Sequence, residues 1–444
     1  MKKVISLFLC VVMISLLAAC SKQSTSSDSD TGPSGEVQTA GETSSSKKVY
    51  RILSGSSESS TTYKVLKELA DRYKSEVNPD FEYEAEIITS TNDLWKKLNM
   101  YITADDVPDI FSISNGLISE ELISRGELVN MTGELQKFGV YDSVNTAMKD
   151  FFKSEDGDMY MIPSGFNGEF FVYRTSTFEK YQLTPPETWE QFLKNCQVLK
   201  DNGEIPYVMR GADSVMYLRF LAFPSWTTEG GSFVKELLSG ETSFADSETG
   251  QYSSKLLYDL GTGGYFIPGY NNMTLSDVVD TFLSGQGAMC YASTSYVGKL
   301  KDLYDQGEIG FFPVPRPEGK ETNGAGIPTH GGKGWGINKK SYDNDPVLQD
   351  FFQYFVGHVD EEFFKMGEIS WMDQELPEEQ LPKLMSDLGK QMQAQPIAWV
   401  SWDDKMQPAT LTTAGDAAQE LVNGMITPEE FAVKLDEAIK SNGG

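Results

Sequence analysis

The spacing of apolar residues predicts alternating strands and helices from residue 49 onward. Residues 49–53 form a short apolar run that stops at Ser54-Gly55-Ser56, which is typical of a buried strand followed by a loop. Residues 81–88 and 109–111 predict two further strands. Between the first two runs, apolar residues recur with a helical period at Leu66, Leu69, Ala70, Tyr73 and Val77. This rhythm indicates an α/β layer with a parallel sheet.

The second half of the chain continues the alternation. Thr188-Trp189-Glu190-Gln191 is a capping box and predicts a helix whose apolar face includes Cys196, so Cys196 is expected in the core. Strands are predicted at residues 287–291, 309–312 and 335–337, and a last helix is predicted to start at Thr427. There is no internal repeat, and no low-complexity linker divides the chain after Ser46. Two lobes in such a chain would have to exchange strands.

The N-terminus has the features of a secretory signal. Lys2 and Lys3 precede an apolar stretch at residues 4–17, which ends in Leu17-Ala18-Ala19-Cys20. A cysteine directly after small residues resembles a bacterial lipoprotein signal, which implies that residues 1–19 are removed and that Cys20 is lipidated. An ordinary signal with a chance cysteine is the alternative. Residues 20–46 are mostly Ser, Thr, Gly and acids, which predicts a flexible tether reaching roughly 25–30 Å.

Composition and motifs exclude several classes of protein. The net charge is -28, with 37 Lys and Arg against 65 Asp and Glu, so the chain repels nucleic acids and anionic lipid heads. Two histidines and four cysteines exclude a histidine-rich metal site and a disulfide scaffold, and no cofactor is predicted. No nucleotide-binding, serine-hydrolase or zinc-protease motif occurs. Chance produces acidic pairs among so many carboxylates, and the pairs here are Asp105-Asp106, Glu361-Glu362 and Asp403-Asp404. They are expected on the surface, and no enzyme activity is predicted.

Several local patterns occur in one order along the chain. They are residues 104–111 (ADDVPDIF), 159–163 (MYMIP), 171–174 (FVYR), 185–189 (PPETW), Phe282 with 287–289 (GAM), 312–315 (FPVP), 331–337 and 427–439. Together with the lipoprotein signal, this ordered set resembles family 1 of the extracellular solute-binding proteins, which are maltose-binding-protein-like ABC transporter lipoproteins. Two residues depart from the family pattern. Arg174 stands where Asn is usual, and Cys290 follows the Ala-Met pair.

The resemblance implies an α/β, two-lobed periplasmic-binding-protein-like fold of type II. Each lobe would be a sheet flanked by helices, hinged at a central cleft. Crossings between the lobes are expected near Ser164, Ile309 and Phe352. Residues 47–164 with 309–352 would then form the first lobe, and residues 165–308 with 353–444 the second. Cys196 and Cys290 would share the second lobe, as a disulfide or, since Cys196 lies on a core face, more readily as two free thiols.

The expected ligand site lies beyond the carboxyl ends of the strands, where open α/β sheets bind ligands. Sugars need aromatic rings for their C–H faces and planar polar groups for their hydroxyls. By their place after predicted strands, or by the resemblance, the candidate ligand-binding residues are Ser56, Glu58, Ser114, Asn115, Asn167, Asp213, Trp226, Thr294, Tyr296, Gly332, Trp335 and Trp402.

The resemblance implies a substrate-binding subunit of an ABC importer. Such a protein would be a monomer anchored through Cys20 on the outer face of the bacterial membrane. It would capture a sugar or oligosaccharide by lobe closure and deliver it to the permease. Two alternatives stay open. The acidic charge would suit a cationic solute such as a polyamine, and a surface glycosidase would need two carboxylates ~5–9.5 Å apart.

Overall fold

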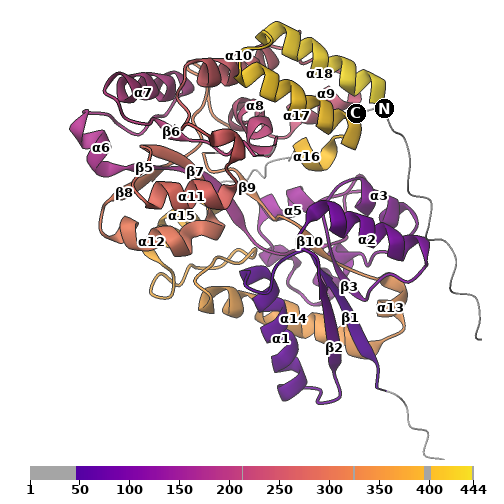
Figure 1. Ribbon diagram of the computed structural model, residues 1–444. Helices are drawn as coiled ribbons and strands as arrows, with labels where there is room; N and C mark the ends of the chain where they lie inside the picture. The colour runs from indigo at the N-terminus through magenta and orange to yellow at the C-terminus, as the bar shows by residue number, and fades with distance from the viewer. Residues whose placement is uncertain (1–46, 213, 324–325, 395–401, 443–444) are drawn as a thin grey trace, which may run out of the picture. The chain divides into compact units, whose positions relative to one another are not determined.

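The computed structural model describes residues 47–212, 214–323, 326–394 and 402–442. Figure 1 shows their helices and strands. The strands form two five-stranded sheets, each with its own covering helices. We call the first sheet with its helices the first lobe, and the second sheet with its helices the second lobe.

The first sheet has the strand order β2-β1-β3-β10-β4. β1 runs parallel to β2 and β3, as the apolar runs predict, whereas β10 lies antiparallel between β3 and β4. The carboxyl ends of β1, β2 and β3 therefore share one edge of the sheet. The strands are β1 (Val49–Ser54), β2 (Glu82–Ile87), β3 (Ile110–Ile113), β4 (Ile162–Pro163) and β10 (Gly334–Ile337).

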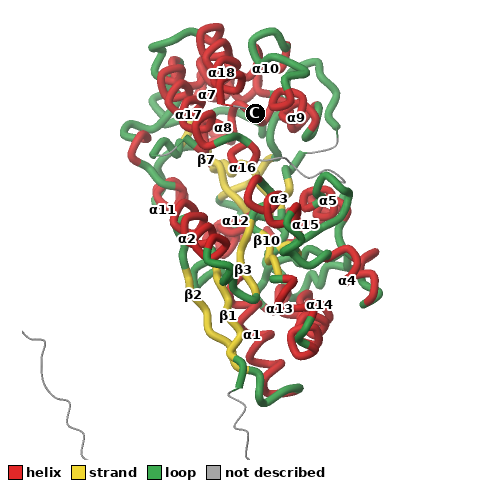
Figure 2. The backbone as a smooth tube through the Cα atoms, turned by 90° about the vertical axis from the view of Figure 1, so that its right-hand side faces the viewer, coloured by secondary structure: helices red, strands yellow, loops and turns green. Residues whose placement is uncertain are grey.

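Helices cover the first sheet through an aromatic core. α1 packs along α14, and Figure 2 shows the two helices together on one side of the strands. Tyr73, Phe81 and Phe351 meet between them with ring centroids 4.8–5.3 Å apart. Val77, predicted on the buried face of α1, lies just beyond the helix and is half exposed. The helices are α1 (Thr61–Glu76), α2 (Thr91–Thr103), α3 (Leu117–Ser124), α4 (Met131–Lys137), η1 (Tyr141–Ser143), α5 (Thr146–Phe152), α13 (Lys339–Asp343) and α14 (Pro346–Lys365).

The second sheet has the order β6-β7-β5-β8, and β9 pairs with the start of β5. Its central strand, β5, is antiparallel to β7 and β8. Phe171 of β5 lies at the centre of an aromatic core and stacks on Phe312 of β8 at 5.3 Å. The strands are β5 (Asn167–Arg174), β6 (Tyr207–Val208), β7 (Met289–Ser293), β8 (Ile309–Phe312) and β9 (Thr329–His330).

Two predicted helix starts in the second lobe are confirmed. Thr188 accepts a hydrogen bond from the Gln191 amide at the start of α7, and Thr427 and Glu430 cap each other at the start of α18. Among the described residues, no helix is both long enough and apolar enough to cross a membrane. The helices are α6 (Thr175–Lys180), α7 (Trp189–Asp201), α8 (Val215–Thr228), α9 (Ser232–Ser239), α10 (Glu248–Thr262), η2 (Tyr270–Asn272), α11 (Leu275–Leu283), η3 (Thr294–Tyr296), α12 (Val297–Asp305), α15 (Lys383–Gln393), α16 (Trp402–Lys405), α17 (Pro408–Val422) and α18 (Pro428–Asn442).

The crossings between the lobes differ in part from the prediction. The first lies between β4 and β5, next to Ser164 as expected. The second does not fall near Ile309, because β8 pairs with β5 and the chain passes to the first sheet only between β9 and β10. The apolar pattern of β8 is compatible with membership of either sheet, so the sequence alone did not assign it. In the structure, the packing of Phe312 on Phe171 places β8 in the second sheet.

The third crossing also lies later than Phe352. α14 continues to Lys365 against α1, and the following segment still bonds the first lobe, where the Asn145 amide donates to the carbonyl of Trp371. α15 then packs on α12 of the second lobe. The crossing is therefore placed between residues 373 and 383. Phe352 lies on the buried face of a 20-residue helix whose length the local pattern did not predict.

Both departures from the family pattern lie in the second lobe, where Cys290 is buried and Arg174 is partly buried. The Arg174 guanidinium donates to the carbonyl of Phe282 and lies 4.7 Å from its ring centroid, so this residue fastens α11 to β5. Cys290 pairs across the sheet with Val172. Cys196 and Cys290 are both buried free thiols, so the disulfide alternative is not found.

Candidate functional site

The two crossing segments between the sheets meet each other. Ser164, after β4, donates a hydrogen bond to the carbonyl of Lys333, and Asn167 at the start of β5 donates to the carbonyl of His330 at 3.5 Å. Thr62 at the start of α1 donates to the carbonyl of Ser164 at 3.1 Å. These contacts bring the carboxyl ends of the first-sheet strands next to the start of β5. We call this region the junction site.

On the first-lobe side, the loop after β1 is packed tightly. The Gly55 amide donates to Ser112 Oγ at 2.9 Å. A Cβ at Gly55 would lie 2.7 Å from Leu94 Cδ2 and 3.1 Å from Lys333 Cδ, so a larger residue there would displace the buried Leu94 side chain. Leu94 near the start of α2 and Lys333 in the loop before β10 therefore both pack against Gly55 at the end of β1. Ser56 is half exposed and Glu58 is exposed next to it.

Asn115, which follows β3, is 6% exposed. Its Nδ2 donates to the carbonyls of Phe151 and Lys153, at 2.6 and 3.4 Å, and so ties the β3 end to α5. Its Oδ1 is buried and has no hydrogen-bond partner in the described part of the chain. A buried acceptor without a donor costs ~1–3 kcal/mol, which is unusual at a purely structural position. Ser114 beside it is half buried.

On the second-lobe side, the end of β7 supplies a hydroxyl and a ring. Thr294 is buried and its Oγ1 accepts a hydrogen bond from the Gly168 amide at 3.2 Å, which holds β7 to the start of β5. Tyr296 is half buried, and burial raises the pKa of its phenol, so the ring stays neutral at physiological pH. Lys299 Nζ lies 5.9 Å from the ring centroid.

Two charged residues and a histidine at the junction were not predicted from the sequence. Glu169 of β5 is 6% exposed, and its carboxylate lies 3.6 Å from Arg219 Nε of α8 and 3.6 Å from His330 Nε2 of β9. The Gly332 amide donates to His330 Nδ1 at 3.1 Å, so the neutral imidazole carries its proton on Nε2, toward Glu169. A charged residue within an apolar stretch could have indicated both positions in the sequence. Glu169 directly precedes the apolar run that starts at Phe170, and Arg219 is the one charged residue of the apolar helix α8.

Three predicted ligand-contacting tryptophans lie in the core instead. Trp226, Trp335 and Trp402 are 2%, 3% and 0% exposed, so they present no ring face to a ligand. A position after a strand indicates the edge of the sheet, but it does not indicate which way the side chain points. Gly332 has φ +64°, a conformation suited to glycine, and so shapes the loop that carries Lys333. Asp213 and Cys20 lie outside the described residues.

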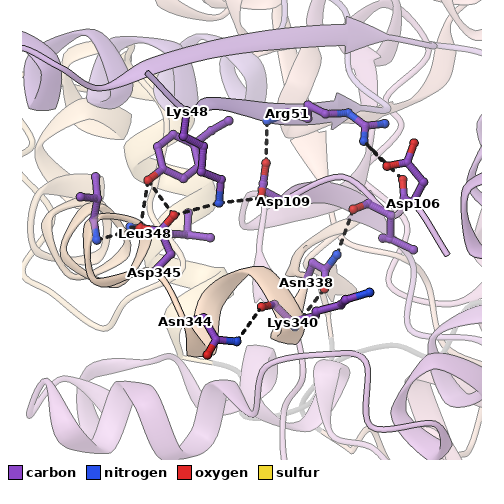
Figure 3. Close-up of polar contacts among 12 residues, drawn as sticks. Lys48, Arg51, Asp106, Asp109, Asn338, Lys340, Asn344, Asp345 and Leu348 are labelled. Atoms are coloured by element: carbon purple, nitrogen blue, oxygen red, sulfur yellow. Dashed lines mark hydrogen bonds and ion pairs between the residues drawn. The ribbon is translucent and has the colours of Figure 1, made fainter. Parts of the chain in front are cut away.

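A separate polar network lies at the amino ends of the strands (Figure 3). Asp109 accepts a hydrogen bond from the Arg51 amide at 2.8 Å and lies 3.4 Å from Lys48 Nζ. Lys48 also reaches Asp345 at 2.8 Å, and Asp345 caps α14 through the amides of Val347 and Leu348. These groups satisfy one another, so the network fastens β1 to β3 and α14.

Comparison with known proteins identifies the class. The family model for the bacterial extracellular solute-binding protein matches residues 57–361, which is more than half of the chain. The chain belongs to this family of solute-binding proteins.

Individual relatives are more distant. An uncharacterized ABC transporter extracellular-binding protein of Pyrococcus horikoshii is 26% identical over 230 residues, covering 50% of this chain and 51% of the relative. The multiple sugar-binding protein of Streptococcus mutans is 24% identical over 265 residues, covering 56% and 59%. The chain thus spans about half the length of the curated relatives it matches.

Solved structures extend the likeness to nearly the whole fold. A chitin oligosaccharide binding protein superposes with a TM-score of 0.74 at 21% identity, covering 89% of this chain and 99% of that one. The fold predicted from the sequence, a two-lobed type II periplasmic-binding-protein-like architecture, is confirmed.

Proposed function

We propose that this protein captures a sugar or oligosaccharide outside the cell and delivers it to an ABC importer. The observation that carries the proposal is the convergence of polar side chains from both lobes on the junction site. Asn115, Asn167 and Glu169 offer planar amide and carboxylate groups, the type that pairs with sugar hydroxyls. The relatives named for sugar and chitin oligosaccharide binding support the same ligand class.

The local charge favours a neutral ligand over a cationic one. Among the described residues, Glu169 lies beside Arg219 and His330, and Lys333 follows in the same loop. Arg219 and Lys333 offset the carboxylates of Glu169 and Glu58, so the acidity of the whole chain is not concentrated at the junction. A polyamine would meet cationic side chains there, whereas a neutral polyol can use both kinds of group as hydrogen-bond partners.

The acidic pairs do not suit hydrolysis. Asp106 pairs with Arg51 and Asp105 with Lys340 near the amino ends of the strands, away from the junction. Glu362 pairs with Arg72 on the outer helices. The side chains of Asp403 and Asp404 lie outside the described set. These observations support a binding role without catalysis.

The proposed cycle uses the three crossings as a hinge. A ligand that bonds the β3 end on one lobe and the β7 end on the other stabilises the closed state in preference to the open one. The closed protein then delivers its ligand to the permease while lipidated Cys20 and the tether of residues 20–46 keep it, as a monomer, at the outer face of the membrane.

A thermal-shift screen of the full chain, followed by calorimetric titration, tests the ligand class. The panel contains melibiose, stachyose, diacetylchitobiose, tetraacetylchitotetraose, xylobiose and xylotetraose, with spermidine as the cationic comparator. We expect at least one sugar to raise Tm, since a ligand at 100 times its Kd adds ~2.7 kcal/mol of stability. Chromatography should recover that sugar intact. Stabilisation by spermidine alone, or cleavage of a sugar, would contradict the proposal.

A further inference from the structure

Acidic side chains gather at the junction edge of the first lobe. Glu120 lies in the first turn of α3, which begins shortly after Asn115 at the end of β3. Burial raises the pKa of Glu120, and the nearby carboxylates of Glu155 and Asp156 raise it further. Asp156 stays ionised at neutral pH, because hydrogen bonds, first of all from Ser154 Oγ at 2.6 Å, lower its pKa. Within the first lobe, the charge on Glu120 is therefore repelled by its neighbours.

The charge that opposes this repulsion comes from the second lobe. Lys405 is the last residue of α16, and it is the one cation among the described residues that lowers the pKa of Glu120. Its attraction outweighs the repulsion from either single carboxylate. α16 belongs to the second lobe, because it packs on α8 and its Trp402 ring lies 5.8 Å from the ring of Phe244. Figures 1 and 2 both show α16 next to α3, so these two helices bring the lobes side by side.

Because Glu120 and Lys405 belong to different lobes, the distance between them depends on the hinge. A Coulomb attraction grows as the distance falls, so the pair gains most when the lobes come together. We propose that Glu120 and Lys405 form an electrostatic latch, which pairs directly when the lobes close and delays their reopening. This inference rests on the proposed capture by lobe closure. The two residues act as positioning residues, through the equilibrium between open and closed lobes.

A latch of this kind sets the rate of release rather than the rate of capture. The sugar enters while the lobes are apart, when the pair has not yet formed, so the association rate constant stays the same. Release requires the lobes to separate, which breaks the pair. Both side chains are only partly buried, so salt screens their attraction and the effect is a few-fold in rate.

A double-mutant cycle tests the pair directly. Stopped flow measures the dissociation rate of the bound panel sugar for wild type, Glu120→Gln, Lys405→Gln and the double variant, and melting curves report the fold. We expect each single substitution to raise the dissociation rate roughly two- to fivefold, and the double variant to raise it no further. Glu120→Gln removes a charge that its own lobe repels, so its melting temperature should stay level or rise. Faster release would then not be a loss of fold.

Glu121→Gln is the matched control, because Glu121 is an exposed acid on the same helix that pairs with Arg125 at 3.4 Å. Its dissociation rate should equal that of wild type. High salt should speed release from wild type and from this control, but hardly from the double variant. Single variants with unchanged rates would overturn the latch. Effects that multiply in the double variant would overturn it too, since independent residues behave in that way.

Cross-linking tests the same pair without a sugar. Glu120→Cys and Lys405→Cys are combined in the full chain with Cys10→Ser and Cys20→Ser, and the remaining native thiols are buried. A short bis-maleimide should join the two introduced cysteines, and a saturating sugar should speed the reaction. No cross-link in either condition would overturn the latch. If no panel sugar binds wild type, the proposed function fails, whereas cross-linking still shows whether the lobes bring these two positions together.

Discussion

Glu169 at the junction site is held by charged and polar partners within the fold. Its carboxylate is buried between a guanidinium and an imidazole that come from α8 and β9. Removing one partner of a buried charge pair typically costs 3–5 kcal/mol, because the other charge remains buried. Residues of this kind are poor probes of ligand contact, since their substitution disturbs the fold as well. Half-buried residues with weak protein contacts are better probes.

Asn167 and Tyr296 meet that condition. The Asn167 side chain makes one hydrogen bond to another described residue, and it is long at 3.5 Å, while Tyr296 is half buried. We expect Asn167→Ala to raise the Kd of the bound sugar roughly five- to a hundredfold, because a hydroxyl loses its partner at a cost of ~1–3 kcal/mol, and Tyr296→Ala to raise it at least as much. Calorimetric titration measures the affinity and melting curves report the fold.

Asn99→Ala is the matched control for these variants, since Asn99 is exposed on α2. Its affinity and melting temperature should equal those of wild type. Two site variants with unchanged affinity would remove these residues from the site, and a large drop in melting temperature would assign them a structural role.

At the scale of elements, the amino end of α14 shows how the first lobe is fastened. Asp345 caps the helix and accepts bonds from Lys48 and Tyr50, so one carboxylate joins α14 to β1. Burial alone raises the pKa of Asp345, but these bonds together with the Leu348 amide lower it below the usual value. A depressed pKa means that the stabilisation exists above the unfolded pKa of ~3.9 and is lost as pH falls through the folded pKa.

We therefore expect Asp345→Asn to lower the free energy of unfolding by about 1–2 kcal/mol at pH 7, because asparagine keeps the cap but loses the charged bonds. The deficit should shrink as pH falls below ~3.9. Urea denaturation at several pH values between 7 and 3 measures it. Asp343→Asn, which removes an exposed pair with Lys339, should cost at most ~0.5 kcal/mol. A deficit for Asp345→Asn that stays constant with pH would show that its charge contributes nothing.

The sequence predicted the positions of strands and helices better than it predicted which sheet a strand joins or which residues its side chains contact. The apolar runs of β1, β2 and β3 and the caps of α7 and α18 are local signals, and the structure contains all of them. Which sheet β8 joins depends on whether Phe312 packs on Phe171, and these two residues are far apart in the chain. The buried tryptophans failed as site candidates for a related reason, because side-chain direction depends on tertiary packing.

In the whole molecule, three crossing segments connect the two lobes, in place of one flexible linker. The crossing after β4 and the crossing before β10 are joined by the hydrogen bond from Ser164 to the Lys333 carbonyl. A change of backbone conformation in one crossing therefore affects the other. Such an arrangement favours a hinge motion of two rigid lobes over independent drift.

Small-angle scattering of the full chain should therefore show a smaller radius of gyration once the bound sugar reaches saturation. A panel sugar that gives no thermal shift should leave the radius of gyration unchanged. This control shows that dissolved sugar alone does not change the measured radius. An unchanged radius with a saturating ligand would indicate a rigid site, and hence a capture mechanism without closure.

The insertion of β10 between β3 and β4 has a consequence for synthesis. The ribosome makes β3 and β4 long before it makes residues 334–337, so both strands have an unfilled edge while the second sheet is being translated. Open strand edges pair readily with other chains, and incomplete domains aggregate for this reason. Any nonsense mutation before Ile337 would release a polypeptide in which the first sheet cannot be completed, however much of the second lobe had already been produced.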